Sequence, residues 1–249
     1  MWNKRFCAIT FGALMLVIVA AACEHAERDE DEKASAPASS TSPARVEQAA
    51  PVQPSGKSFV YNFDNLPAGA LPGIFSSART GEGAVGKWQV RADDTAPSKP
   101  NVLAQTSADT TDYRFPIAVS NEGVFKDLEL SVKFKAISGS VDQAGGLVFR
   151  YKDENNYYIV RANALENNYR LYHVINGRRQ QFAGANLTVT SKQWHELKVV
   201  CVGNQITCFF DGKQEIQATD ETFKEAGKIG VWTKADSVTY FDDLSVTAR

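Results

Sequence analysis

The sequence predicts one all-β domain of the sandwich or barrel class, spanning residues 58–249. Apolar and polar residues alternate with period two in short runs such as Trp-Gln-Val-Arg at 88–91. Turn pairs such as Asn176-Gly177 and Asp211-Gly212 stand between these runs and supply the positive φ angles of tight hairpins. A short helix is expected only at residues 220–226. About a dozen short strands without intervening helices exclude a βαβ fold and favour two packed antiparallel sheets.

The first 22 residues are typical of an export signal, with two basic residues followed by an uncharged apolar run at 11–22. This run is shorter than the roughly 20 apolar residues that a membrane-spanning helix needs. Val-Ala-Ala-Ala-Cys at 19–23 resembles the lipobox of bacterial lipoproteins, although Ala20 stands where leucine is favoured. We expect cleavage before Cys23 and lipidation of this cysteine. The alternative is an ordinary signal peptide.

Residues 23–57 are predicted to form a disordered tether, because charged residues followed by Ala, Ser, Pro and Gln bury too little apolar surface to offset the ordering entropy. Loss of the signal removes two basic and no acidic side chains, so the net charge of −2 becomes about −4. The absence of a basic stripe argues against a nucleic-acid partner. We expect a lipid-anchored protein of the bacterial cell envelope, and Glu24 after the acylated cysteine favours the outer membrane.

Residues 145–182 are predicted to form four strands joined by three hairpin loops. The expected facing pairs are Tyr151 with Tyr158, Asn163 with Asn168 and Ile175 with Arg178. Because side chains alternate between the faces of a strand, these pairs separate two surfaces. The core face collects Leu147, Phe149, Tyr151, Tyr158, Val160, Ala162, Tyr169, Leu171, His173, Ile175 and Phe182. The polar face collects Val148, Arg150, Ile159, Arg161, Asn163, Arg170, Tyr172 and Gln181.

The polar face supplies the candidate ligand-binding residues Arg150, Arg161, Asn163, Arg170 and Tyr172. Guanidinium and amide groups suit the recognition of hydroxyl and carboxylate groups, and tyrosine offers a stacking surface. The alternative is a solvated sheet face whose arginines pair with Glu166, Glu129 or Asp153.

The same residues carry a family resemblance. Gly-Gly-Leu-Val-Phe-Arg-Tyr-Lys-Asp-Glu-Asn-Asn-Tyr-Tyr at 145–158, Trp-His-Glu-Leu-Lys-Val at 194–199 and Phe-Asp-Asp-Leu-Ser-Val at 241–246 resemble concanavalin A-like jelly-roll domains. Within that superfamily the chain is most similar to laminin-G-like domains and to the 3-keto-disaccharide hydrolase group. The resemblance covers nearly all of residues 58–249. It implies a two-sheet jelly roll whose concave face often binds glycans, although such a fold does not fix the function.

No catalytic set is identified in the sequence. Glycosidases need two placed carboxyl groups, and the Glu-x-Asp-x-x-Glu pattern of the glucanases that share the jelly roll does not occur within residues 58–249. Glu129 is the lone acid of its strand on the polar side. The leading expectation is therefore a non-catalytic glycan-binding domain, with a hydrolase of the 3-keto-disaccharide type and a structural envelope protein as alternatives. Two acids facing each other across the concave cleft would favour the enzyme, and a floor of aromatic and arginine residues without paired acids would favour binding. A flat or occluded polar face would favour the structural protein.

A calcium ion is a further expectation, since concanavalin A-like domains often tie their first and last strands through such an ion. Asp64 and Asp242 lie in matching places near the two ends of the domain, and backbone carbonyls would complete the oxygen shell. The alternative is that both aspartates cap turns.

Cys201 and Cys208 flank the Gly203-Asn204 turn and fall on one face, diagonally across the predicted hairpin. An exported domain meets an oxidising compartment, which favours a disulfide between them. Two buried free thiols are the alternative.

Overall fold

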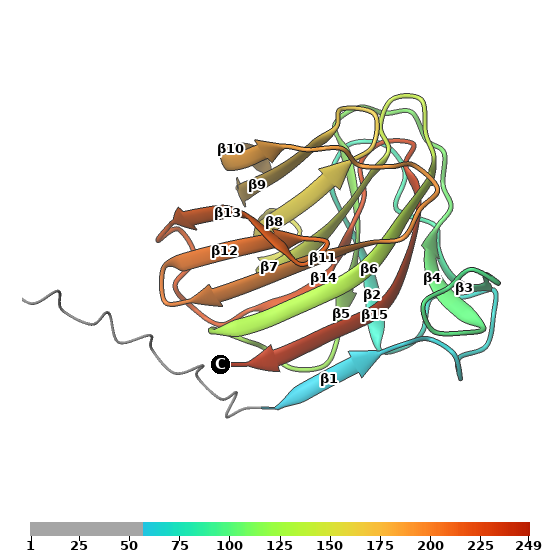
Figure 1. The fold of residues 1–249 in the computed structure, drawn as a ribbon, viewed down its shortest axis with the longest axis horizontal. Coiled ribbons are helices and arrows are strands. Elements are labelled where there is room, and N and C mark those ends of the chain that lie inside the picture. Colours follow the sequence, from blue (N-terminus) through green and yellow to red (C-terminus); the bar gives the residue numbers. More distant parts are fainter. Residues whose placement is uncertain (1–56) are drawn as a thin grey trace, which may run out of the picture. The chain divides into compact units, whose positions relative to one another are not determined.

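The computed structural model describes residues 57–249, which form two antiparallel sheets packed face to face (Figure 1). The sheet here called sheet A contains, in spatial order, β13 (Lys213–Thr219), β12 (Gln205–Phe210), β11 (His195–Val202), β6 (Leu128–Ser138), β15 (Val238–Ala248), β4 (Asn101–Gln105) and β3 (Trp88–Ala92), with β1 (Ser58–Tyr61) also paired to β15. Sheet B contains β10 (Arg178–Asn186), β9 (Asn168–Ile175), β8 (Asn156–Asn163), β7 (Ala144–Asp153), β14 (Lys228–Trp232), β5 (Arg114–Ser120) and β2 (Phe75–Gly81).

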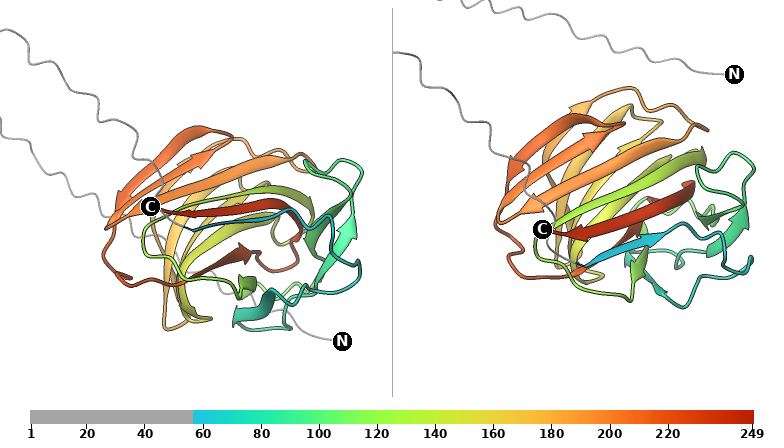
Figure 2. Two further views of the ribbon diagram at one scale, coloured as in Figure 1. Left: turned by 90° about the horizontal axis from the view of Figure 1, so that it is seen from below. Right: turned by 60° about the horizontal axis from the view of Figure 1, so that its bottom comes forward.

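This architecture confirms the predicted all-β sandwich. Strands β1 and β15 come from opposite ends of the domain and lie side by side (Figure 2), with Phe59 opposite Val246. Residues 220–226, for which the sequence predicts a short helix, form an irregular connection instead. Within the described range, no helix is long and apolar enough to span a membrane.

The main core lies between the two sheets. Sheet A contributes residues such as Phe134, Leu197 and Phe241, and sheet B contributes Phe149 and Leu171, all of them fully buried. Alternation along each strand brings these side chains to one side, and removing them from water provides the main stabilisation of the fold.

Strands β7 to β10 match the predicted hairpins, with one correction. Asn163 pairs with Asn168 and Ile175 pairs with Arg178, as predicted. The expected pair of Tyr151 with Tyr158 is wrong, because Tyr158 pairs with Phe149. The register shifts between Phe149 and Asp153, where a bulge inserts extra residues into β7.

The bulge is centred on Arg150, whose φ is 46°. It moves Tyr151 from the expected core face to the opposite face of sheet B, where this ring packs with Tyr157. Gly227 approaches the bulge so closely that a Cβ there would lie 2.4 Å from the carbonyl carbon of Arg150. Only glycine therefore fits beside this turn of the chain.

The two cysteines of the β11–β12 hairpin are free, buried thiols rather than the favoured disulfide. Cys208 lies opposite Val199, whereas Cys201 lies opposite Ile206, so the two cysteines are diagonal neighbours. Diagonal residues of paired strands are about 7–8 Å apart. A disulfide needs Cα atoms within about 7 Å, which explains why no bridge forms.

Candidate functional site

The candidate site lies on the outer face of sheet B, the face turned away from sheet A. A second apolar cluster covers this face and draws its members from sheet B alone: Phe115, Ile117, Val119, Ala144, Val148, Tyr151, Tyr157, Ile159, Tyr172, Val174 and Trp232. A sheet face open to water usually alternates apolar core residues with polar outer residues. The outer face of sheet B departs from this pattern, because its side chains form a buried apolar cluster with several aromatic rings.

Arg179 of β10 extends over these rings. Its guanidinium carbon lies 4.6 Å from the ring centroid of Phe115, 4.6 Å from that of Tyr172 and 5.7 Å from that of Trp232. We call these four residues the arginine–aromatic cluster. The distances fall within the range of attractive cation–π contacts.

The cluster joins strands that are far apart in the sheet order, since four strands separate β10 from β5. Sheet B must therefore curve strongly to bring Arg179 onto Phe115. Tyr113, which precedes β5, also links β5 to the β9–β10 hairpin. Its hydroxyl donates to the carbonyl of Gly177 at 2.9 Å and accepts from the amide of Arg179 at 3.1 Å.

A polar network continues from the cluster along β8 and β9. Arg161 is buried and donates to the Tyr172 hydroxyl at 3.0 Å, to the Asn168 side chain and to Glu166 at 2.8 Å. Burial opposes the ionisation of Glu166, but the Arg161 charge and the Asn168 hydrogen bond lower its pKa below the usual value. The network therefore holds the Glu166 carboxylate and the Arg161 guanidinium together beside the arginine–aromatic cluster.

Asp142 is the buried acid of this region. Its carboxylate accepts from the Asn163 amide at 2.8 Å, and Lys234 Nζ lies 3.0 Å from its other oxygen. Burial raises the pKa of Asp142, while the Lys234 and Arg161 charges oppose that rise. Burial would also lower the pKa of Lys234, but Asp112 and Asp142 together raise it. A buried acid held between cations can stabilise charge or exchange a proton.

Four of the five predicted ligand residues lie on this face. Arg161, Asn163 and Tyr172 join the network described above. Arg170 pairs with Arg161 across the strands and donates to the Ala185 carbonyl at 2.6 Å and to the Asn186 side chain at 2.5 Å. The predicted face therefore exists, but its polar groups are more deeply buried and more fully paired than a solvated surface.

Arg150 is not part of this face, because the bulge in β7 turns it away. Its guanidinium is 1% exposed and donates to the carbonyls of Lys126 at 2.8 Å, Phe223 at 2.7 Å and Gly203 at 2.7 Å. Asp127 also lies 3.4 Å away. Arg150 therefore fastens three loops together, and its assignment to the ligand-binding face is wrong.

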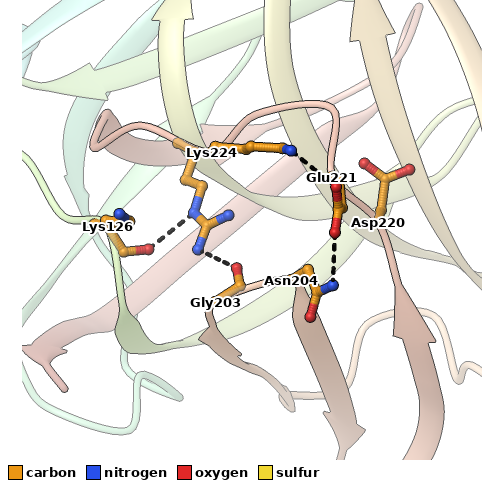
Figure 3. A pocket seen from close by; sticks show the side chains of 7 residues that line it. Lys126, Gly203, Asn204, Asp220, Glu221 and Lys224 are labelled. Atoms are coloured by element: carbon orange, nitrogen blue, oxygen red, sulfur yellow. Dashed lines mark hydrogen bonds and ion pairs between the residues drawn. The ribbon is translucent and has the colours of Figure 1, made fainter.

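Arg150 is one of the residues that line a pocket of about 340 Å³ (Figure 3). The other lining residues are Lys126, Gly203, Asn204, Asp220, Glu221 and Lys224. Figure 3 shows Lys224 and Asn204 pointing toward Glu221, which they contact at 2.8 Å and 3.0 Å. Asp220 accepts from the Tyr158 hydroxyl and from the Thr222 amide, so both acids of the pocket already have partners.

Three important residues of the outer face were not predicted from the sequence: Arg179, Trp232 and Asp142. Arg179 was within reach, because the confirmed pair of Ile175 with Arg178 places Val174 opposite Arg179 and assigns both to the outer face. Trp232 is fully buried, so nothing in its setting distinguishes it from a residue of the main core. Asp142 precedes β7 and has no local pattern that marks it.

The predicted calcium residues lie on either side of the chain at 98–101. Asp242 is fully buried and accepts from the Ser98 amide at 3.0 Å, and Asp64 accepts from the Asn101 amide at 3.2 Å. The Ser98 hydroxyl lies 2.5 Å from Asp243 and 3.3 Å from Asp242. Burial raises the pKa of Asp242 to about 6, and the neighbouring Asp243 adds to the rise. Both oxygens of Asp242 therefore accept hydrogen bonds from protein donors, since the Asp243 amide also donates to this carboxylate at 2.8 Å.

No group of three or more His, Cys, Asp or Glu side chains between residues 57 and 249 has the geometry to hold a metal ion. Backbone carbonyls would therefore have to complete the oxygen shell around Asp242, and the calcium site stays a prediction. Glu129, which the sequence marked as the lone acid on the polar side of its strand, lies on β6 of sheet A and pairs with Arg249 and Lys198.

The two packed antiparallel sheets form a jelly-roll β-sandwich. The chain belongs to the family of the 3-keto-alpha-glucoside-1,2-lyase-like domain, whose model matches residues 81–247. This confirms the resemblance to the 3-keto-disaccharide hydrolase group. No curated protein sequence matches the chain.

Solved structures show the same fold. The carbohydrate binding module CBM66 from Bacillus subtilis has a TM-score of 0.56 at 18% identity, over 71% of this chain and 98% of the module. The β-glucanase of Bacillus licheniformis has a TM-score of 0.51 at 13% identity, over 78% of this chain and 99% of the enzyme. A protein of galectin-like fold from Bacillus subtilis has a TM-score of 0.50 at 13% identity, over 70% and 90% of the chains. At these identities the likeness establishes the fold and leaves the function open.

Proposed function

We propose that this protein binds glycans through the outer face of sheet B, with the arginine–aromatic cluster at the centre of the binding surface. The observation that carries the proposal is Arg179 held over Phe115, Tyr172 and Trp232 beside the Arg161 network. Ligand sites combine an apolar lining with a few fixed polar groups, and this face has both. Sugar hydroxyls both donate and accept, which matches neighbouring guanidinium and carboxylate groups.

The acids of this face favour binding over glycoside hydrolysis by paired carboxylates. Asp142 is 1% exposed and held by Lys234, and Glu166 is held by Arg161. The two-carboxylate mechanism requires two carboxyl groups that are both free to act on one glycosidic bond, and Asp142 and Glu166 are not free in this sense. Phe115 and Trp232 have no exposed surface, so a sugar would contact the polar groups above the rings.

A glycan array tests the proposal with the purified full chain in detergent. We expect binding that is lost in Arg161→Ala and retained in Arg178→Ala, because Arg178 is exposed and faces the other way along β10. Thermal unfolding of both variants establishes that they are folded. Equal binding by both variants would place the ligand elsewhere, and no binding by the wild type would remove the proposal.

A second candidate is cleavage of a 3-keto-α-glucoside, which the family match favours. A 1,2-elimination removes the C2 proton, which the neighbouring ketone acidifies. A base takes the C2 proton, the C2–H electrons form a C1–C2 double bond, and the aglycone leaves with the electrons of the C1–oxygen bond and takes up a proton from the protonated base or from water. Asp142 is the group on this face whose raised pKa suits proton transfer. Release of nitrophenol from a nitrophenyl 3-keto-α-glucoside, abolished in Asp142→Asn, would support this reaction.

We further propose that the domain is carried at the bacterial cell envelope by lipid on Cys23. The supporting features are the charged start, the apolar run and the lipobox-like sequence, all of which lie outside the described residues. Labelling with radioactive palmitate tests this proposal. We expect label on the wild type and none on Cys23→Ser, whereas label on both would show that the cysteine is not the acylated residue.

A further inference from the structure

Arg179 differs from the other buried arginines in having no acceptor for its guanidinium. Arg114 donates to the carbonyls of Ala84 and Ala235, each at 2.6 Å, and Arg150 donates to three carbonyls. Among residues 57–249, the Arg179 guanidinium forms no hydrogen bond and no ion pair, and its Nη1 atom is buried without a hydrogen-bond partner.

The other cations of the outer face are already paired. Arg161 is bound to Glu166, and Lys234 is bound to Asp112 at 2.6 Å and to Asp142 at 3.0 Å. Arg179 is therefore the cation of this face whose charge is met only by ring faces. Arg161 adds a further unused donor, because its Nε is buried without a partner.

An unmatched guanidinium in an apolar setting is costly, because burial removes water without supplying hydrogen-bond acceptors. Ring faces attract a cation but do not replace those acceptors. Burial accordingly lowers the pKa of Arg179 below its usual value. The residue as a whole is only half-buried, so an incoming anion can reach its exposed side.

We propose that Arg179 binds the carboxylate of an acidic sugar, so that the ligand of this face is a uronate-containing glycan. The inference rests on the proposed function and names its ligand class. A planar guanidinium fork matches a carboxylate with two parallel hydrogen bonds. The neighbouring Arg161, Tyr172 and Glu166 then face the hydroxyl groups of the same sugar or of the next one.

A sulfate ester on a sugar also presents a negatively charged oxygen group to Arg179. The experiment must therefore distinguish a carboxylate from a sulfate. Calorimetric titrations use the full chain in detergent with tetrasaccharides of galacturonate, glucuronate or mannuronate. Each acid is compared with its methyl ester, which keeps the sugar and removes the charge, and with a sulfated galactan tetrasaccharide.

We expect at least one free acid to bind tenfold or more tightly than its methyl ester, with the difference shrinking at high salt. Arg179→Ala should abolish the preference, and Arg178→Ala should keep it. Arg179→Lys retains the charge without the fork, so we expect a reduced preference. Thermal unfolding of each variant shows that it is folded.

Other outcomes would overturn the inference. Equal binding of acid and ester, still lost in Arg161→Ala, would leave glycan binding at this face intact and remove the uronate. Binding of the sulfated tetrasaccharide alone would replace the carboxylate by a sulfate. No binding of any neutral or acidic glycan would remove the inference together with the proposed function.

Discussion

Arg150 and Arg179 are both largely removed from water, yet their guanidinium groups have opposite surroundings. Arg150 donates to three backbone carbonyls, whereas Arg179 has rings and no acceptor. We expect Arg150→Met to lower the free energy of unfolding by roughly 3 kcal/mol, at about 1 kcal/mol for each carbonyl that loses its donor. Arg179→Met should change it by less than about 1 kcal/mol, because an apolar chain suits the rings.

Urea unfolding at neutral pH measures both changes, with the exposed Arg178→Met as the control. A loss of several kcal/mol in Arg179→Met would mean that its charge is compensated in the folded protein, against the contacts described above. Substitution of Arg179 should therefore weaken anion binding while leaving the free energy of unfolding nearly unchanged.

The cysteine thiols provide a second residue-scale prediction. Burial raises the pKa of Cys201 to about 11, and Cys208 is also raised by burial. Because the thiolate is the reactive form, both groups should be inert in the folded protein. We expect Ellman's reagent to detect neither thiol before denaturation and both afterwards, without any reductant. Failure to detect them after denaturation would establish the disulfide that the sequence favoured.

At the scale of an element, Asp236 holds the turn at 139–142 that presents Asp142 to the outer face. Its carboxylate accepts from the amides of Ser140 at 2.6 Å, Val141 at 3.0 Å and Asp142 at 3.0 Å. Burial opposes ionisation, but these hydrogen bonds keep the pKa of Asp236 below the usual value. A carboxyl group with a lowered folded-state pKa stabilises the protein above its unfolded pKa, and this contribution is lost as the pH falls through the folded value.

We therefore expect Asp236→Asn to lower the free energy of unfolding by about 1–3 kcal/mol at pH 7, as for a lost charge-assisted acceptor. The difference from the wild type should shrink below about pH 4, the unperturbed value of an aspartate, because the carboxyl of the unfolded wild type takes up a proton there while the folded one stays ionised to lower pH. Urea unfolding between pH 7 and pH 3 measures this, with the exposed Glu225→Gln as control. A difference that does not depend on pH would assign the effect to lost packing.

Hairpin turns could be predicted from local sequence, whereas the bulge could not. Asn176-Gly177 and Asp211-Gly212 have positive φ angles at both positions, as their residue types require. Arg150 also has a positive φ, but nothing in its own strand indicates it. The bulge depends on Gly227, which is far along the chain and allows the backbones to approach. Because of this bulge, Arg150 lies outside the predicted site and Tyr151 lies on the outer face.

At the scale of the whole molecule, alternation and turns were sufficient to predict the two-sheet fold. They fix which side of a strand is apolar, and the family resemblance adds the topology. The centre of the site depends instead on curvature, because Arg179 meets Phe115 only when sheet B bends across four intervening strands. The alternation of apolar and polar residues along a strand does not indicate how strongly the sheet is curved. The sequence therefore located the polar face but not the residue at its centre.

The calcium prediction also concerns the whole molecule, because its residues connect the two ends of the domain. Asp64 follows β1, Asp242 belongs to β15, and both bind the chain at 98–101. Ligand present at about 100 times its dissociation constant stabilises a protein by about 2.7 kcal/mol. In a domain of this size, that corresponds to a rise of roughly 5–10 °C in melting temperature.

We therefore expect calcium to raise the melting temperature of the wild-type protein relative to EDTA, and magnesium to do so much less because it demands a tighter octahedral shell. Asp242→Asn should abolish the rise, since the buried carboxylate is the central oxygen donor, and Glu225→Gln should keep it. Differential scanning calorimetry at neutral pH makes the comparison. Equal melting temperatures in EDTA and in calcium would show that Asp64 and Asp242 fasten the ends of the domain by hydrogen bonds alone. The raised pKa of Asp242 would then belong to a buried carboxyl without a cation.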